Sequence, residues 1–276
     1  MQSGQLLAIS FQLWTLDTRH STLDTPGMPA YHTSGTTRQT PATALCLLPS
    51  AYRPPMFRIK ICGITRVEDA LMVAEAGADA IGLNFYPASR RYLTPETAEA
   101  ILAAAPNRVK KVGLFVNSPA AQVVAAFERL GLDLIQLHGD EPPEYLGQLA
   151  GRPTMKAFRL GPEGLPPITE YLDRCRALQC VPALCLIDSF VSGHYGGTGR
   201  VADWSKLEPY PIENWHPPLV LAGGLTPDNV TQAIEQVRPH AVDTSSGVES
   251  SPGRKDPDLV RRFVAAAKAA WMKAES

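Results

Sequence analysis

The chain has 276 residues, of which 45% are hydrophobic and 19% are charged, and its formal net charge at pH 7 is −1. These values are typical of a globular protein that buries a sizeable core in one large domain or two small ones. A nearly neutral chain gives no electrostatic reason to expect nucleic acid or anionic membranes as partners. The sequence has no apolar run of membrane-spanning length, and its start lacks the pattern of a secretory signal.

Cysteine usage indicates free thiols in a reducing compartment. The cysteines are Cys46, Cys62, Cys175, Cys180 and Cys185. Their number is odd and their positions are scattered, which does not fit a disulfide framework. The last three are five residues apart, which is not a usual zinc-ligand spacing, and Pro182 interrupts them. We therefore expect a cytoplasmic protein without a metal site.

Residues 1–55 differ in character from the rest of the chain. They are rich in Ser, Thr, Pro and Gln and show no lasting helical or strand period, which is typical of disorder. Met56 then stands directly before the first predicted strand. Two interpretations follow: translation starts at Met56, or residues 1–55 are a genuine flexible extension. In both, residues 56–276 are expected to form the catalytic domain.

From residue 57 onward, short apolar β-rich runs alternate with amphipathic stretches. Eight runs predict strands, at residues 57–62, 80–85, 111–116, 132–138, 155–158, 184–188, 219–222 and 241–244. The stretches between them predict helices, at residues 67–76, 95–105, 119–130, 142–150, 166–178, 227–237 and 257–273, with only a short one at 203–207. Several of these helices begin with Pro after Thr, Ser or Asp, which is an N-terminal capping signal.

This alternation predicts an α/β fold with a parallel sheet, because near-continuously apolar strands are buried on both faces. Eight repeats favour a closed (β/α)₈ TIM barrel. An open, doubly wound sheet is the alternative, although no G-x-G-x-x-G motif follows the first strand.

In such a barrel, chemistry occurs at the C-terminal ends of the strands. Glycine and serine turns follow the last two predicted strands and allow backbone N–H groups to approach a ligand closely. With the N-terminus of a short helix beside them, these turns predict a phosphate site, although each is also an ordinary turn signal. The candidate residues at strand ends are Cys62, His138, Asp188, Gly223, Gly224, Asp243, Ser245, Ser246 and Gly247.

Cys62 is a candidate base or nucleophile. A lone cysteine is usually a buried core thiol, but Lys60 lies two residues earlier on the same strand face, where a cation stabilises the thiolate. Asp188 is either a carboxyl group with a catalytic role or a cap. The Gly-rich loop 193–199 after it is suited to act as a lid.

Two further side chains have a functional and a structural interpretation. Arg91, or its neighbour Arg90, could clamp a carboxylate with a bidentate fork, whereas most arginines are solvated at the surface. His138 could act as a base, whereas a histidine at a strand end more often makes structural hydrogen bonds.

Six segments, in order, resemble the phosphoribosylanthranilate isomerase family of tryptophan biosynthesis. They are residues 60–65 (KICGIT), 85–92 (FYPASRRY), 136–141 (QLHGDE), 195–199 (YGGTG) followed by DW at 203–204, 222–230 (AGGLTPDNV) and 245–253 (SSGVESSPG). The resemblance implies a barrel of the ribulose-phosphate-binding type and an aldose–ketose isomerase. The reaction implied is an Amadori rearrangement, without metal or redox cofactor.

The resemblance also implies residue roles. Cys62 matches the general base, Asp188 the general acid, and Arg91 the arginine that contacts the anthranilate carboxylate. The turns at Gly223-Gly224 and 245–247 match the phosphate site. We expect Lys60, His138 and Asp243 to contribute to binding of a small phosphorylated substrate, by a protein that is a monomer or homodimer.

Three residues depart from the family pattern. Thr244 replaces an apolar residue, Ala202 replaces an aromatic one, and Asn84 adds a polar group to the second strand. Two alternatives remain at this stage: a sister phosphate-binding barrel, such as indole-glycerol-phosphate synthase or a histidine-pathway isomerase, and a catalytically silent barrel that only binds phosphorylated ligands. The sister enzymes use Lys/Glu or paired Asp at the strand ends, so Cys62 with Asp188 favours the anthranilate isomerase.

Overall fold

The structure is a computed structural model that describes residues 56–189, 204–207, 209–211 and 213–275. The predictions for residues 1–55, for the loop 193–199 and for Ala202 therefore lie outside the described residues. None of the described helices is long and apolar enough to cross a membrane.

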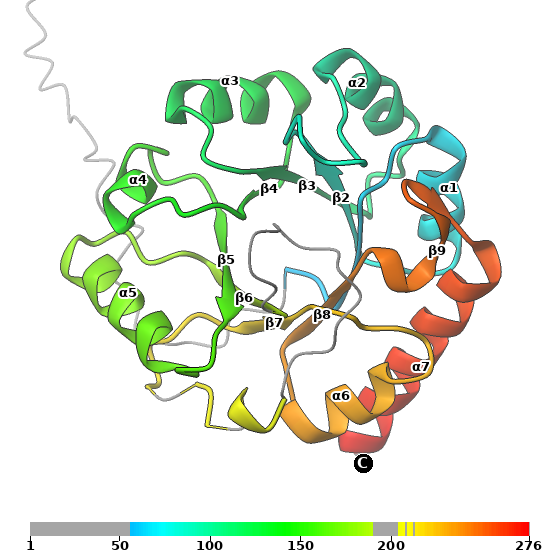
Figure 1. Cartoon of the computed structure of the whole chain (residues 1–276). Helices are drawn as coiled ribbons and strands as arrows, with labels where there is room; N and C mark the ends of the chain where they lie inside the picture. The colour runs from blue at the N-terminus through cyan, green and yellow to red at the C-terminus, as the bar shows by residue number, and fades with distance from the viewer. Residues whose placement is uncertain (1–55, 190–203, 208, 212, 276) are drawn as a thin grey trace, which may run out of the picture. The chain divides into compact units, whose positions relative to one another are not determined.

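Eight parallel strands close into a barrel in which each strand pairs with the next and β8 pairs with β1. Figure 1 looks along the barrel, with the helices arranged around the outside. The closed barrel is confirmed, and the open sheet is wrong. The strands are β1 (Ile59–Cys62), β2 (Ala80–Asn84), β3 (Lys110–Phe115), β4 (Leu134–Leu137), β5 (Thr154–Leu160), β6 (Leu184–Ser189), β7 (Leu219–Leu221) and β8 (Ala241–Thr244).

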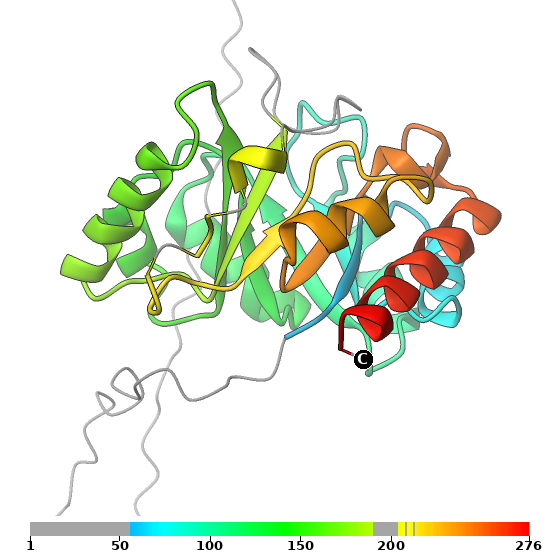
Figure 2. The same ribbon diagram turned by 90° about the horizontal axis from the view of Figure 1, so that it is seen from below.

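Helices follow the strands as the alternation predicted. They are α1 (Val67–Glu75), α2 (Pro95–Ala104), α3 (Ala120–Leu130), α4 (Pro143–Gly147), α5 (Pro166–Ala177), α6 (Val230–Val237) and α7 (Pro257–Glu275). A 3₁₀ turn, η1 (Trp204–Leu207), takes the place of the short helix predicted at 203–207. The side view of Figure 2 shows α7 running beside α1, with which it is in contact.

The capping signals were right at some helices and wrong at others. The Thr94 hydroxyl accepts a hydrogen bond from the backbone of Thr97 at the start of α2, and the Asp256 carboxylate accepts two at the start of α7. At α6 the helix begins three residues later than predicted, because the Asn229 side chain accepts a hydrogen bond from Thr226 N and closes a turn first. The helix predicted at 142–150 is shorter, since α4 ends at Gly147.

Alternate residues of each strand face opposite sides of the barrel wall. In β1, Ile59 and Ile61 belong to the large apolar cluster between the strands and the helices. Lys60 and Cys62 alternate with them and face the barrel interior. The lower interior is filled by a second apolar cluster that includes Val112, Leu134, Met155, Leu186 and Val220. A polar site is therefore expected at the C-terminal ends of the strands, which this cluster does not fill.

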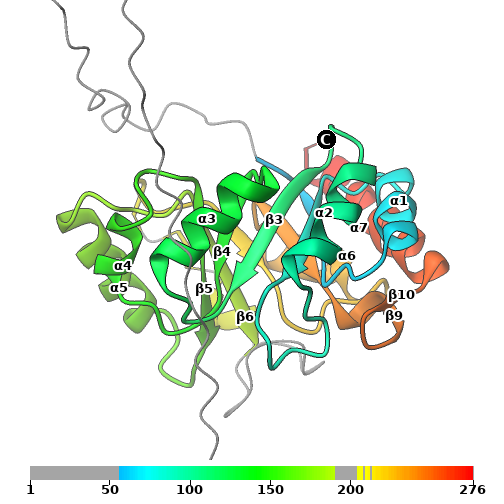
Figure 3. The ribbon, with the colours of Figure 1, turned by 90° about the horizontal axis from the view of Figure 1, so that it is seen from above.

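A short antiparallel hairpin after β8 was not predicted. Its strands are β9 (Glu249–Ser251) and β10 (Arg254–Lys255), and they follow the 3₁₀ turn η2 (Ser246–Val248). The hairpin is fastened to the start of α1, because the backbone of Lys255 donates to the Asp69 carboxylate and Thr65 donates to the carbonyl of Gly253. Figure 3 shows the hairpin at the end of the barrel toward which the arrow of β3 points.

Candidate active site

One cavity at the C-terminal ends of the strands brings nearly all the predicted site residues together. It is lined by Cys62 from β1, Asp188 from β6 and Arg91 from the loop after β2, and by both glycine turns. Lys60 is the exception, because its side chain is fully buried and does not line the cavity. The predicted residues in the wall are Cys62, Arg91, His138, Asp188, Gly223, Gly224, Asp243, Ser245, Ser246 and Gly247.

Cys62 ends β1 with its thiol on the inner face. The neighbouring residue on β2 is Gly82, and a Cβ there would lie 2.7 Å from Cys62 Sγ and 3.0 Å from Lys60 Nζ. The thiol and the ammonium therefore flank one point that only glycine leaves empty. Burial raises the pKa of the Cys62 thiol, while the positive charge of Lys60 opposes this shift.

Lys60 and Asp243 form an ion pair across the adjacent strands β1 and β8. Lys60 Nζ lies 2.8 Å from Asp243 Oδ1, and both residues are buried. A buried charge is tolerated only when it is paired, so each group requires the other. The pair places a fixed cation in the layer beneath Cys62, as the spacing of Lys60 predicted.

Asp188 faces the cavity from β6 and lies beside His138. The distance from His138 Nε2 to Asp188 Oδ2 is 3.4 Å, and Gln136 Nε2 lies 2.9 Å from His138 Nδ1. If the amide N–H donates to Nδ1, the neutral ring carries its proton on Nε2, on the side of Asp188. Gln136 and His138 thus form a polar row next to the predicted acid.

The two predicted phosphate turns lie against each other. Gly223 and Gly224 have φ values of 91° and 66°, a region that favours glycine. A Cβ on Gly247 would come 1.9 Å from the carbonyl oxygen of Leu225, so the second turn can pack there only with glycine. The Thr244 hydroxyl donates to the same carbonyl at 2.7 Å. Thr244 was expected to depart from the family pattern, and its hydroxyl adds a hydrogen bond between the two turns.

Ser245 places a side-chain hydroxyl in the cavity wall, next to the two turns. Its hydroxyl is buried and has no hydrogen-bond partner among the described residues. Buried polar groups are normally paired, so an unpaired hydroxyl in a cavity wall favours a polar ligand there.

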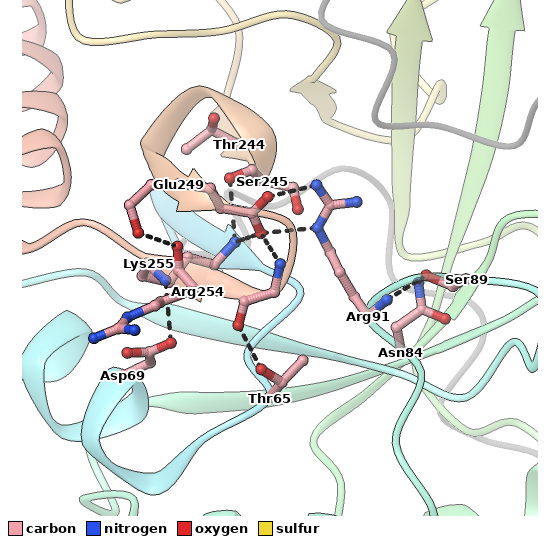
Figure 4. A network of polar contacts seen from close by, with 12 residues as sticks. Thr65, Asp69, Asn84, Ser89, Arg91, Thr244, Ser245, Glu249, Arg254 and Lys255 are labelled. Carbon is pink, nitrogen blue, oxygen red and sulfur yellow. Dashed lines mark hydrogen bonds and ion pairs between the residues drawn. The ribbon is translucent and has the colours of Figure 1, made fainter.

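Arg91 reaches the cavity over Gly63, the residue after Cys62. A Cβ on Gly63 would lie 2.3 Å from Arg91 Cδ, so glycine gives the side chain room. The backbone N–H of Arg91 donates to Ser89 Oγ, which in turn accepts a hydrogen bond from the Asn84 amide (Figure 4). The Asn84 side chain, also noted as a departure, therefore helps to order the turn that carries Arg91.

Sequence reasoning missed the partner of Arg91. Glu249 of β9 accepts two hydrogen bonds from its guanidinium, and Lys255 of β10 donates to Glu249 (Figure 4). The only sequence signal was that Glu249 lies in the segment 245–253, one of the six that resemble the family. Its pairing with a loop 158 residues away requires the folded barrel.

The acidic end of the 136–141 segment has a structural role in this fold. Glu141 is buried, pairs with Lys156 of β5 at 2.8 Å, and accepts backbone hydrogen bonds from Asn117 and Gly139. It does not line the cavity. Among the described residues, no group of three or more His, Cys, Asp or Glu side chains is placed to hold a metal ion.

Comparison with known proteins identifies the family. Residues 59–266 match the family model of N-(5′-phosphoribosyl)anthranilate (PRA) isomerase. The chain belongs to this family. It is 48% identical to the N-(5′-phosphoribosyl)anthranilate isomerase of Geobacter sulfurreducens over 77% of this chain and 99% of that protein. With the Stutzerimonas stutzeri isomerase the identity is 50%, over 76% and 96% of the two chains.

Solved structures of phosphoribosylanthranilate isomerases share the fold. The crystal structure from Thermotoga maritima aligns with a TM-score of 0.67 at 41% identity, covering 77% of this chain and 99% of that one. A second isomerase structure, in complex with reduced 1-(o-carboxyphenylamino)-1-deoxyribulose 5-phosphate, aligns with a TM-score of 0.65 at 40% identity and the same coverage. The resemblance stated from the six segments is thus confirmed at the level of the family.

Proposed function

We propose that this barrel isomerises N-(5′-phosphoribosyl)anthranilate to 1-(o-carboxyphenylamino)-1-deoxyribulose 5-phosphate, with Cys62 as general base and Asp188 as general acid. The reaction is an Amadori rearrangement in tryptophan biosynthesis, and its class is that of an intramolecular oxidoreductase, an aldose–ketose isomerase. The observation that carries the assignment is the placement of a thiol on β1 and a carboxyl group on β6 in the wall of one cavity.

The chemistry requires one acid and one base. Asp188 protonates the furanose ring oxygen while the bond from that oxygen to C1′ breaks and the nitrogen lone pair forms a C1′=N bond. The resulting Schiff base makes the C2′ proton acidic, and Cys62 removes it to give an enolamine. Gain of a proton at C1′ and loss of the proton of the 2′-hydroxyl give the ketone. Each proton transfer by a positioned side chain contributes about 10²–10⁴-fold.

The positions of β1 and β6 in the barrel are consistent with separate acid and base roles. Going round the barrel, β7 and β8 separate β6 from β1, so the two groups approach a bound sugar from different sides. The Lys60–Asp243 pair lies beneath the base, and the polar row of Gln136 and His138 lies beside the acid. This arrangement supports separate acid and base roles instead of a shared proton between two adjacent groups.

Arg91 and the two glycine turns supply substrate binding. The Arg91 guanidinium would bind the carboxylate of the anthranilate ring, and backbone N–H groups near Gly223, Gly224 and Gly247 would bind the 5′-phosphate. The unpaired Ser245 hydroxyl is available to the same phosphate. Asp243 and His138 line the cavity and would contribute to substrate binding, whereas Lys60 lies outside its wall and acts on Cys62.

The loss of anthranilate fluorescence on turnover of freshly generated substrate tests this proposal. We expect rapid decay with the full chain and a loss of at least about 10²-fold in kcat with Cys62→Ala. A folded wild-type protein that causes no decay would instead favour a sister barrel or a silent binder of phosphorylated ligands. Retention of full turnover by Cys62→Ala would remove the thiol from the mechanism.

Partners and location are proposals of the same kind. The partner we propose is the small phosphorylated substrate, and the location is the cytoplasm, where the thiols stay reduced. A monomer or a homodimer remains the prediction for assembly. One of the Thermotoga maritima structures is of monomers generated from a dimeric isomerase.

A further inference from the structure

Arg91 uses only one edge of its guanidinium for contacts within the described protein. Nε donates to Glu249 Oε1 at 2.8 Å and Nη2 donates to Glu249 Oε2 at 2.5 Å. A guanidinium has five N–H donors arranged in a fixed fork, so this contact leaves one proton of Nη1 and one of Nη2 side by side on the other edge. That second edge is also bidentate, and the Arg91 side chain lines the cavity.

Glu249 by itself would weaken the attraction of Arg91 for an anion, because the two charges cancel. Lys255 restores a net positive charge: its Nζ lies 2.7 Å from Glu249 Oε1, and its side chain is fully buried. Burial alone would raise the pKa of the Glu249 carboxyl, but Arg91 and Lys255 together outweigh burial and hold that pKa below its usual range. Burial lowers the pKa of Lys255, and the charge of Glu249 opposes that shift. When all three groups are ionised, their net charge is about +1.

The same network joins the Arg91 loop to the phosphate turn. Lys255 Nζ also donates to the carbonyl oxygen of Ser245 at 3.1 Å (Figure 4). The hairpin that carries Glu249 and Lys255 starts directly after the η2 turn. One rigid set of contacts thus fixes the distance between the guanidinium and the turn that would hold phosphate.

We infer that Glu249 and Lys255 are positioning residues for substrate recognition: Glu249 aims the free edge of Arg91 at the anthranilate carboxylate, and Lys255 keeps the subsite cationic. Neither side chain lines the cavity, so both act indirectly: Glu249 acts through Arg91, and Lys255 acts through Glu249 and the Ser245 carbonyl. The inference rests on the proposed function, in which Arg91 binds that carboxylate. The inference adds that the selectivity for a ring carboxylate depends on residues outside the cavity, which orient Arg91.

Two stable ligands separate this role from a merely structural one. The first is reduced 1-(o-carboxyphenylamino)-1-deoxyribulose 5-phosphate, and the second is the same compound without the carboxyl group. Both are titrated calorimetrically into the full chain and its Glu249→Gln variant. We expect the Kd of the first to rise about tenfold or more and that of the second to change less than about twofold, because only the first uses the free edge of Arg91.

Three further variants complete the test. Glu128→Gln is the matched control, because Glu128 accepts from Arg152 Nε at 2.9 Å and Nη2 at 2.6 Å on the surface, and it should change neither Kd. Lys255→Met should weaken both ligands, because Lys255 also donates to the Ser245 carbonyl oxygen in the phosphate turn, but it should weaken the carboxylate ligand more. This variant keeps the test open if Glu249→Gln does not fold. In an Arg91→Gln background, adding Glu249→Gln should cause no further loss for the carboxylate ligand.

The outcomes distinguish failure of the inference from failure of the function. Equal losses for both ligands in Glu249→Gln and Lys255→Met, or an added loss in the Arg91→Gln background, would overturn the positioning role while leaving the proposed reaction intact. Failure of the wild-type chain to bind either ligand would overturn both. Turnover supplies the last readout: KM should rise in Glu249→Gln while kcat stays within about twofold, since Glu249 does not contact the reacting atoms.

Discussion

Lys60 Nζ and Asp243 Oδ1 lie 2.8 Å apart in the layer of the barrel directly beneath the Cys62 thiol. The pair places two opposite charges close to one titrating group, and the two charges act on its pKa in opposite directions. The positive charge of Lys60 favours the thiolate and lowers the pKa, whereas the negative charge of Asp243 disfavours the thiolate and raises it. This relationship can be tested by changing one charge at a time.

The Cys62 thiol is expected to titrate above the usual range of cysteine, because burial is the largest influence on its pKa. Its thiolate fraction, and with it the rate of alkylation by iodoacetamide, should still be rising at pH values where an exposed thiol is already ionised. Lys60→Met should move the midpoint to higher pH and Asp243→Asn should move it to lower pH. The pH dependence of alkylation measures all three midpoints.

Cys62→Ala serves as the blank for this experiment, since it reports alkylation of the other cysteines. Shifts of the same sign in Lys60→Met and Asp243→Asn would contradict the electrostatic account, because a general loss of packing moves both variants in one direction. The sign of each shift, more than its size, decides the question.

Asp188→Asn should lower kcat by at least about 10²-fold while binding of the reduced product analogue survives. The amide has nearly the shape of the carboxyl group but cannot deliver a proton to the ring oxygen. Stopped-flow fluorescence gives kcat, and calorimetry gives the Kd of the analogue. A variant that binds the analogue and retains wild-type turnover would assign the acid to another group, and His138, 3.4 Å from the carboxylate, would be the next residue to test.

Strand positions and strand-end residues could be predicted from the sequence because local patterns determine them. Each inner strand must be apolar on both faces, and the polar residues Cys62, Asp188 and Asp243 mark the points where the strands reach the open end of the barrel. Lys60 could be placed on the face of Cys62 from the two-residue period alone. Its burial and its pairing with Asp243 could not, because they depend on β8 closing the barrel against β1.

The parts that could not be predicted depend on contacts distant in sequence or on competing local bonds. The β9–β10 hairpin has little apolar alternation, and it is held in place by contacts with the first helix, such as that of Lys255 N with Asp69. The start of α6 moved because the Asn229 side chain closes a turn over the preceding residues. Thr244 and Asn84 were noticed as departures, but their partners, Leu225 O and Ser89, became clear only in the fold.

Thr244→Val should lower the free energy of unfolding by about 1–2 kcal/mol, because it deletes a buried hydrogen bond to Leu225 O at nearly constant volume. That bond joins the two proposed phosphate turns, so KM should rise more than kcat falls. Urea denaturation and steady-state kinetics give the two quantities. Thr169→Val is the matched control, since the exposed Thr169 hydroxyl donates to Pro166 O at 2.9 Å and has no contact with the cavity. Equal effects of the two substitutions on KM would contradict a role for Thr244 in holding the turns.

Gly82→Ala should impair catalysis more than it impairs folding. The added methyl group would lie 2.7 Å from Cys62 Sγ, closer than real contacts allow, and 3.0 Å from Lys60 Nζ, so it must displace the thiol or the ammonium. Catalysis is sensitive to misplacement of a reacting group by about 1 Å, which can cost about 10²-fold. We therefore expect kcat to fall by roughly 10–10²-fold. Gly147→Ala is the control, because a Cβ at Gly147 in α4 meets nothing within 4 Å. Wild-type kcat in Gly82→Ala would mean that the thiol can move without loss of catalysis. That result would contradict the role of Cys62 as the general base.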